Sequence, residues 1–98
     1  MSAHVLALRV DVHLASAQSL KDRRAVLSPV LAGARNRFAV TAADTGDDRR
    51  QRAELSFATV SGSVTRATEV IDAVERFVWS FPELEVLSAE RAWLDLAG

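Results

Sequence analysis

The sequence predicts an α+β fold whose elements follow the order strand, helix, strand, strand, helix, strand. Three observations lead to it: some segments alternate apolar and polar residues, others carry apolar stripes at helical spacing, and an apolar segment closes the chain. This order is that of the split βαβ, ferredoxin-like arrangement. Because its crossovers are right-handed, we expect a four-stranded antiparallel sheet with both helices on one face and the other face open.

The first strand is predicted at residues 6–14, where every second residue is a leucine or a valine. This period of two is typical of a strand with one buried face. The residues between them include Arg9, Asp11 and His13. We therefore expect these three side chains together on the open face of the sheet.

The first helix is predicted to begin after Ser19, because a serine followed three residues later by Asp22 resembles a capping box. Apolar residues from Leu20 onward carry the helix to about Phe38. Pro29 leaves two interpretations open, since it either kinks one helix or forms the first residue of a shorter one. The apolar stripe keeps its phase across the proline, which favours the single kinked helix.

The remaining elements are a hairpin, a helix and a final strand. Residues 40–45 and 52–61 form the hairpin, and the glycine and aspartates between them suit a connection. The second helix carries a regular apolar stripe over residues 64–81, and Pro82 ends it. The last strand is expected at about residues 85–96. Two sets of its residues compete for the inward face: Leu87, Ala89 and Trp93 against Val86, Ala92 and Leu94.

Composition limits the classes of function. The 98 residues suit one domain, residues 1–98, of ordinary globular composition. The chain has no cysteine and two histidines, so disulfides and thiolate chemistry are excluded and a transition-metal site is not expected. No cofactor and no small-molecule ligand is indicated. No apolar run is long enough for a membrane span and no signal peptide is evident, so we expect a cytoplasmic protein without a membrane partner.

Charge is unevenly distributed along the chain. The net charge is −1, yet residues 1–52 carry nine basic against five acidic residues, and residues 53–98 carry three against eight. A net charge near zero argues against bulk attraction of nucleic acid. The asymmetry nevertheless allows a local basic patch.

Nearly the whole chain resembles the YlxP family of small bacterial proteins of unknown function. The resemblance is carried by "HLASAQSLKDRRAVLSPVLAGARNRFAVTAAD" and "QRAELSFATVSG". Its most specific positions are His13, Ser19, Leu20 and Lys21, with the basic pair Arg23 and Arg24 and the "RNRF" segment at 35–38.

The resemblance implies a ferredoxin-like fold and genes that often stand beside those for translation initiation and ribosome maturation factors. It brings no established activity. The sequence departs from the family pattern after Asp44, where "TGDDRR" replaces a longer acidic, histidine-bearing stretch, and at Ala39, where asparagine is usual.

The main candidate site is basic. Lys21, Arg23 and Arg24 lie in the first turns of the predicted helix, whose free amides favour anions. Arg49, Arg50 and Arg52 follow in the hairpin connection. The favoured hypothesis is a non-enzymatic, translation-associated protein that binds phosphates of structured RNA, with ribosomal RNA or a ribosomal subunit as partner. The alternative is that these cations form only a solvated helix face and a charged loop.

Two other polar groups are weaker candidates. His13 beside Asp11 has the residue types of an oriented catalytic base, but no nucleophile accompanies it at a recognisable spacing. We therefore expect His13 to form a hydrogen bond at the strand end, and we predict no catalytic residues. Asp44, Asp47 and Asp48 could coordinate magnesium, but the segment lacks a calcium-loop pattern and its own arginines would compete. Turn chemistry explains these aspartates better.

The two tryptophans suggest a second class of function. Trp79 lies off the apolar stripe of its helix, and Trp93 belongs to the final, presumed edge strand. They are candidate interface residues, or they cover the rim of a small core. The alternative function is therefore a homo-oligomeric protein-interaction module, such as a homodimer, that uses the tryptophans and the open sheet.

Overall fold

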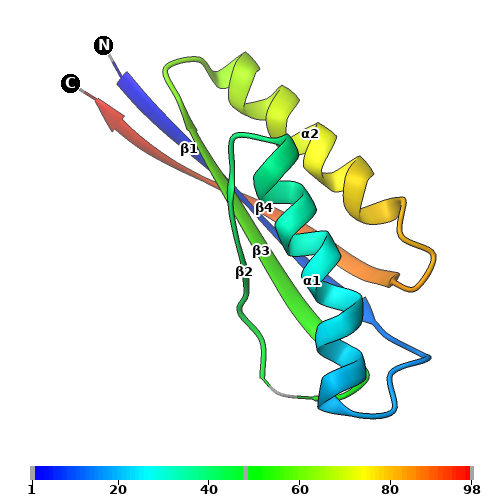
Figure 1. Cartoon of the computed structure of the whole chain (residues 1–98). Coiled ribbons are helices and arrows are strands. Elements are labelled where there is room, and N and C mark those ends of the chain that lie inside the picture. The colour runs from blue at the N-terminus through cyan, green and yellow to red at the C-terminus, as the bar shows by residue number, and fades with distance from the viewer. Residues whose placement is uncertain (1, 48, 98) are drawn as a thin grey trace.

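A computed structural model describes residues 2–47 and 49–97 of the chain. The described elements are β1 (Ser2–His13), α1 (Leu20–Arg37), β2 (Thr41–Asp44), β3 (Arg52–Ser61), α2 (Val64–Trp79) and β4 (Glu85–Ala97). The four strands form one antiparallel sheet in the order β2-β3-β1-β4. Both helices lie on the same face of this sheet, and the other face is open (Figure 1). The predicted ferredoxin-like α+β fold is therefore confirmed.

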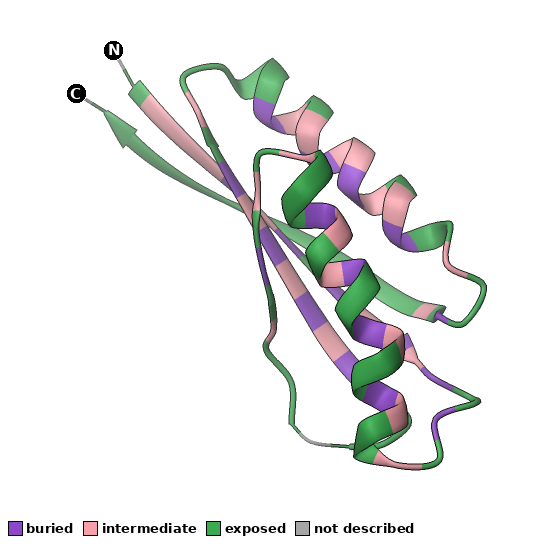
Figure 2. Ribbon diagram, in the orientation of Figure 1, coloured by how far each residue is buried: buried purple, intermediate pink, exposed green. Residues whose placement is uncertain are grey.

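The core lies between the sheet and the two helices. Every second residue of β1 from Leu6 to Val12 is at most 1% exposed, and β3 alternates in the same way from Ala53 to Thr59. Figure 2 shows these buried bands along the sheet and on the inner sides of the helices. Burying one such leucine or valine side chain contributes roughly 1.5 to 3 kcal/mol. The sequence alternation thus separates core residues from open-face residues.

α1 is one helix with Pro29 inside it, so the single-helix interpretation is confirmed and the shorter helix starting at Pro29 is wrong. The predicted cap is present, because the Ser19 hydroxyl accepts the amide of Asp22 at 3.1 Å. The Asp22 carboxylate in turn accepts the amide of Gln18 at 3.0 Å. The first contact satisfies an amide that the first turn of a helix leaves without a partner, and the second ties the residue before the cap to the helix.

The inner faces of the helices differ slightly from the predicted stripes. On α1 the buried residues are Arg23, Leu27, Val30 and Ala34, whereas Leu20 is 42% exposed. On α2 they are Ala67, Ile71, Val74 and Val78, whereas Val64 is exposed. The apolar residue at each helix start therefore lies beyond the region that the sheet covers. Within residues 2–47 and 49–97, neither helix has the length and apolarity to cross a membrane.

The strand predictions hold with three corrections. β1 spans Ser2–His13 where 6–14 was predicted, because residues 2–5 also pair with the end of β4. β2 occupies Thr41–Asp44, one residue shorter at each end than the predicted 40–45. In β4, neither predicted inward set holds throughout, because the pairing with β1 shifts between Asp11 and Val12. Val86 lies opposite the buried Val12, but Ser88 lies opposite Asp11, so the intervening Leu87 changes the alternation.

Candidate nucleic-acid interface

The predicted basic residues are brought together at one end of the domain. The start of α1 and the β2–β3 connection lie side by side there, at the lower end of the view in Figure 1. Leu14 donates its amide to the carbonyl of Gln51 at 2.8 Å, and Arg50 Nη1 donates to the carbonyl of Gln18 at 3.2 Å. We call this region the basic end, defined by Lys21, Arg23, Arg24, Arg49, Arg50 and Arg52.

Arg23 does not present its charge to solvent as the sequence analysis expected. The residue is 4% exposed, and its Nη1 forms a 2.6 Å ion pair with Asp44. Its Nε donates to the carbonyl of Arg52 at 3.3 Å, and its Nη2 donates to the carbonyl of Asp47 at 3.4 Å. Arg23 therefore joins α1 to the end of β2 and to the connection that carries the other arginines. It is a positioning residue of the basic end.

The other cations of the basic end are exposed. Among the described residues, Lys21, Arg24 and Arg52 form no ion pair, whereas Arg49 lies 3.3 Å from the carboxylate of Asp47. A shallow hollow lined by Leu20, Arg23, Arg24 and Asp44 opens between α1 and β2. Arg and Lys side chains of this kind interact well with phosphate oxygens.

The helix start adds less to an anion site than the sequence suggested. The amide of Asp22 already binds the Ser19 side chain, and the amide of Arg23 already binds the Ser19 carbonyl at 3.0 Å. The carboxylate of Asp22 also lies at this end of the helix, where its negative charge opposes an anion. Attraction for phosphate at the basic end would therefore come from side chains.

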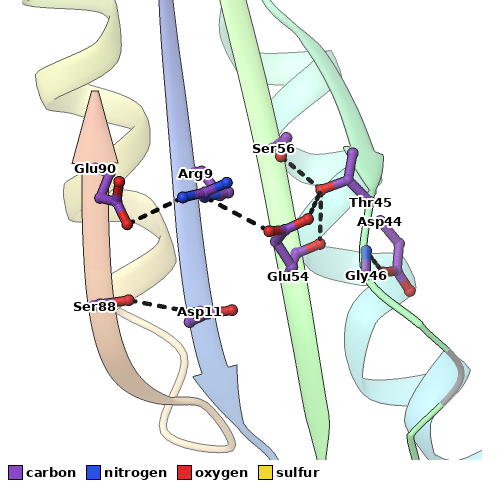
Figure 3. Close-up of polar contacts among 9 residues, drawn as sticks. All are labelled: Arg9, Asp11, Asp44, Thr45, Gly46, Glu54, Ser56, Ser88 and Glu90. Atoms are coloured by element: carbon purple, nitrogen blue, oxygen red, sulfur yellow. Dashed lines mark hydrogen bonds and ion pairs between the residues drawn. The ribbon is translucent and has the colours of Figure 1, made fainter. Parts of the chain in front are cut away.

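The open face beside the basic end carries a polar network (Figure 3). Arg9 Nη2 donates to Glu90 at 3.1 Å, and Arg9 Nε lies 3.5 Å from Glu54 on the other neighbouring strand. The hydrogen bond and charge of Glu90, with the charge of Glu54, raise the pKa of Arg9. Asp11 accepts the Ser88 hydroxyl at 3.4 Å. Because carboxylates outnumber cations in this network, it does not favour phosphate.

His13 and the loop aspartates contact partners that the sequence analysis did not name. His13 Nδ1 lies 3.4 Å from the carboxylate of Glu85, and Asp11 turns to Ser88 instead. Asp44 pairs with Arg23 and also accepts the amide of Gly46 at 3.2 Å, which is turn chemistry. Asp48 lies outside the described residues. The described ranges 2–47 and 49–97 contain no cluster of acidic or histidine side chains that could hold a metal ion.

The two tryptophans are both exposed but lie on different elements. Trp79 on α2 is 60% exposed and lines a groove with Asp72, Glu75, Arg76 and Arg91. Trp93 on β4 is 44% exposed and lies opposite Leu6 of β1, on the side of the sheet that faces the helices. Neither side chain is therefore a buried member of the core. Their use as an interface stays a prediction.

Sequence reasoning missed the structural arginines. Arg23 lies on the buried face of α1, and its spacing from Leu27, Val30 and Ala34 is that of a helical stripe. That spacing could have identified it. Arg91 of β4 contacts Asp72 at 2.8 Å and Glu75 at 3.0 Å on α2. Partial burial lowers the pKa of Arg91, but the hydrogen bonds to these carboxylates raise it overall. No local pattern signals this contact between distant segments.

The fold and the basic end define a small ferredoxin-like domain with a surface cluster of cations. A family model described as "Protein of unknown function (DUF503)" matches residues 5–91. The chain is also 36% identical over 78 residues to "Uncharacterized protein YlxP" of Bacillus subtilis (strain 168), across 79% of this chain and 85% of that protein. The chain therefore belongs to the DUF503, or YlxP, family, as the sequence resemblance predicted.

A solved structure supports the fold alone. The chain is similar to "De novo designed protein Foldit4" with a TM-score of 0.52 and 12% identity, over 98% of each chain. A designed protein at this identity shares backbone architecture and carries no information about a site. The family is of unknown function, so neither comparison assigns an activity.

Proposed function

We propose that this protein is a non-enzymatic, translation-associated factor that contacts structured RNA through its basic end, with ribosomal RNA or a ribosomal subunit as partner. The observation that carries the proposal is the convergence of exposed cations from two chain segments, α1 and the β2–β3 connection. Such a partner implies that the protein works in the cytoplasm.

The chemistry of the basic end favours phosphate contacts over base contacts. Lys21, Arg24, Arg50 and Arg52 are exposed and present ammonium and guanidinium donors. Arg23 pairs with Asp44 and so offsets a negative charge that would otherwise repel a phosphate beside Arg24. The polar network on the neighbouring open face consists of Arg9 with acidic and small polar side chains. None of the side chains drawn in Figure 3 is aromatic, so this network could not stack a base. Binding would therefore depend on RNA shape and charge more than on sequence.

The test is binding of the purified protein to ribosomal subunits and to a structured RNA hairpin across a salt series. The double variant Lys21→Ala/Arg24→Ala removes two exposed cations without touching the buried Arg23. We expect its affinity to fall about tenfold or more, and the slope of log affinity against log salt to decrease by about two. Fluorescence anisotropy with labelled RNA measures both quantities.

The matched control is Arg66→Ala/Arg76→Ala, which removes two exposed cations of α2 and changes the net charge equally. It is expected to bind RNA like the unchanged protein. Equal losses in the two double variants would show attraction by overall charge only and contradict a site at the basic end. Undetectable binding of the unchanged protein at low salt would overturn the proposal.

The second candidate function is a homo-oligomeric protein-interaction module without RNA binding. One observation favours it: β4 is almost fully exposed and carries Trp93, Leu94 and Leu96, each more than two-fifths exposed. Monomeric proteins rarely expose several large apolar side chains together. The open sheet face carries Leu94 and Leu96, whereas Trp79 lies on α2, on the opposite side of the sheet, and would form a separate candidate contact.

A further inference from the structure

β4 is a long edge strand whose outer side is unpaired within the described chain. It spans 13 residues without proline and pairs with β1 on one side only. Such an edge presents a row of backbone donors and acceptors that another strand can pair with. The opposite edge, β2, has four residues. An added strand longer than four residues can therefore pair along its whole length only with β4.

Apolar residues continue across the open face from β3 to this edge. Val60, Val5 and Leu94 lie opposite one another on adjacent strands and form one row. Ala58, Ala7 and Ala92 form the next row. Beyond these two rows the face becomes polar, with Ser56, Arg9 and Glu90 in the following row. The apolar part of the open face thus ends at β4.

We propose that a second copy of this chain pairs with the outer edge of β4, antiparallel, about a two-fold axis at Trp93. The inference deepens the protein-interaction candidate and is independent of RNA binding. An antiparallel two-fold places each residue opposite one on the same face of the sheet. With the axis at Trp93, the two indoles meet on the helix side, and Ala92 of each copy lies opposite Leu94 of the other.

Over Glu90 to Asp95, which lie beyond the shift in pairing at Leu87, charge selects this register. The axis at Trp93 places Arg91 of each copy opposite Asp95 of the other, so unlike charges face one another twice. Within one copy Arg91 also contacts Asp72 and Glu75, and Asp95 contacts His4, so these pairs add to existing contacts. An axis at Glu90, Arg91 or Asp95 would place a charge directly against its own copy, which is destabilising. An axis at Ala92 places Glu90 opposite Leu94, as the Trp93 axis places it opposite Leu96, but it sets Arg91 opposite Trp93 and loses the Arg91–Asp95 pair. An axis at Leu94 would place Trp93 against Asp95 and shorten the paired segment.

The proposed pairing joins the apolar rows of the two copies. Because Leu94 lies opposite Ala92 of the second copy, the row of Val60, Val5 and Leu94 continues into the alanine row of the other sheet. Two four-stranded sheets become one of eight strands. Each copy uses the same β4 edge, so the interface is closed once two copies have paired. The dimer therefore leaves no β4 edge free for a third copy.

The first test is the oligomeric state by sedimentation equilibrium over a concentration series. The unchanged protein is expected to be a dimer. Trp93→Lys places two ammonium groups opposite each other at the axis, and we expect it to weaken the dimer about 30-fold or more. Val60→Lys is the matched control, because Val60 is 69% exposed in the same apolar row but lies on the interior strand β3. It is expected to leave the dimer intact.

The second test identifies the register and does not depend on a charged substitution. The chain has no cysteine, so single cysteines at positions 91 to 95 can be oxidised one at a time. Only a residue on the axis lies opposite itself at a distance that a disulfide spans. We therefore expect the most efficient covalent dimer from Trp93→Cys, and little from Val60→Cys. Circular dichroism checks that each variant remains folded.

Each outcome decides the inference. A monomer at high concentration overturns it, even where the same protein binds RNA through the basic end. Loss of the dimer in Val60→Lys together with retention in Trp93→Lys overturns edge pairing in favour of stacked sheet faces. A cross-linking maximum at position 92 or 94 overturns the Trp93 axis. Dimerisation that persists when the basic-end double variant has lost RNA binding separates the two proposals.

Discussion

The two edges of the sheet differ in length and in how they are covered. β2 has four residues, and two arginines of α1 contact it. Arg23 pairs with Asp44 at the end of the strand, and Arg35 Nη2 donates to the carbonyl of Ala42 at 2.5 Å. β4 has 13 residues, nearly all exposed, and its ion pairs through Arg91 lie on the side of α2. Short, covered edges resist pairing with another chain, whereas long, open edges favour it.

This difference assigns separate roles to the two sides of the molecule. Covering β2 with arginines also fixes the β2–β3 connection, because Arg23 donates to the carbonyls of Asp47 and Arg52. The covered edge therefore lies beside the basic end, where we propose RNA contacts. The open edge lies where we propose a second copy. Substituting the arginines that cover or brace each edge tests the comparison directly.

The largest effect is expected from Arg23→Met, which keeps most of the buried side-chain volume but removes its charge. It leaves Asp44 without its ion-pair partner and removes a side-chain donor from the carbonyls of Arg52 and Asp47, the second of which still accepts the Arg49 amide. We expect the free energy of unfolding to fall by about 3 kcal/mol, the lower end for a broken buried pair, because Asp44 is partly exposed. Urea unfolding followed by circular dichroism measures the loss.

The control for Arg23→Met is the double variant Arg23→Met/Asp44→Leu. Replacing both partners by apolar residues removes the unpaired carboxylate, so the double variant should be more stable than the single one. An additive loss from the two substitutions would contradict coupling across the pair. Hydrogen exchange at residues 45–47 and 49–51 should accelerate in the single variant, because Arg23 donates to the carbonyls of Asp47 and Arg52.

An intermediate effect is expected from Arg35→Met, which removes the side-chain donor to Ala42. The loss of one charge-assisted hydrogen bond at a partly buried carbonyl should lower the free energy of unfolding by about 1 to 1.5 kcal/mol. Faster amide exchange within β2 should accompany it. Arg66→Met, an exposed arginine of α2, is the matched control and should change neither quantity. Equal changes in both variants would argue against a role for Arg35 at this edge.

The smallest effect is expected from Arg91→Met on the open edge. Arg91 braces β4 against Asp72 and Glu75, but its side chain is 32% exposed, so solvent screens the interaction. We expect the free energy of unfolding to fall by less than about 1 kcal/mol, and less still at high salt. Urea unfolding at low and high salt measures both. A loss as large as that of Arg23→Met would show that the two edges are braced equally.

Most of the fold follows from local patterns in the sequence. The alternation along β1 and β3, the Ser19 cap and the regular stripe of α2 each predict the element that the structure contains. The prediction was ambiguous for β4, because its pairing with β1 shifts by one residue after Val86. The alternation of β4 changes phase at Leu87, so its sequence indicates no single inward face. Only the pairing with β1 determines where this change occurs.

The sequence predicted which basic residues belong to the candidate site, but it did not predict which of them are buried or which partners they contact. Clustered charges in the sequence identified the basic residues and the family resemblance suggested their context. Their separate environments were not predictable, since Arg23 and Arg24 are adjacent in the chain but one is buried and the other exposed. Helical geometry turns neighbouring side chains by about 100°, so adjacent residues face different surroundings.

The sequence by itself determined the order of the elements, the core face of every element except β4, and the family, because these depend on local periodicity and residue identity. Only the tertiary structure decided which cations are buried, which carboxylates neutralise them and which edge stays open. These properties arise from contacts between residues far apart in the chain, such as Arg23 with Asp44 and Arg91 with Asp72. Such contacts form only after packing brings the segments together, and no local pattern specifies them.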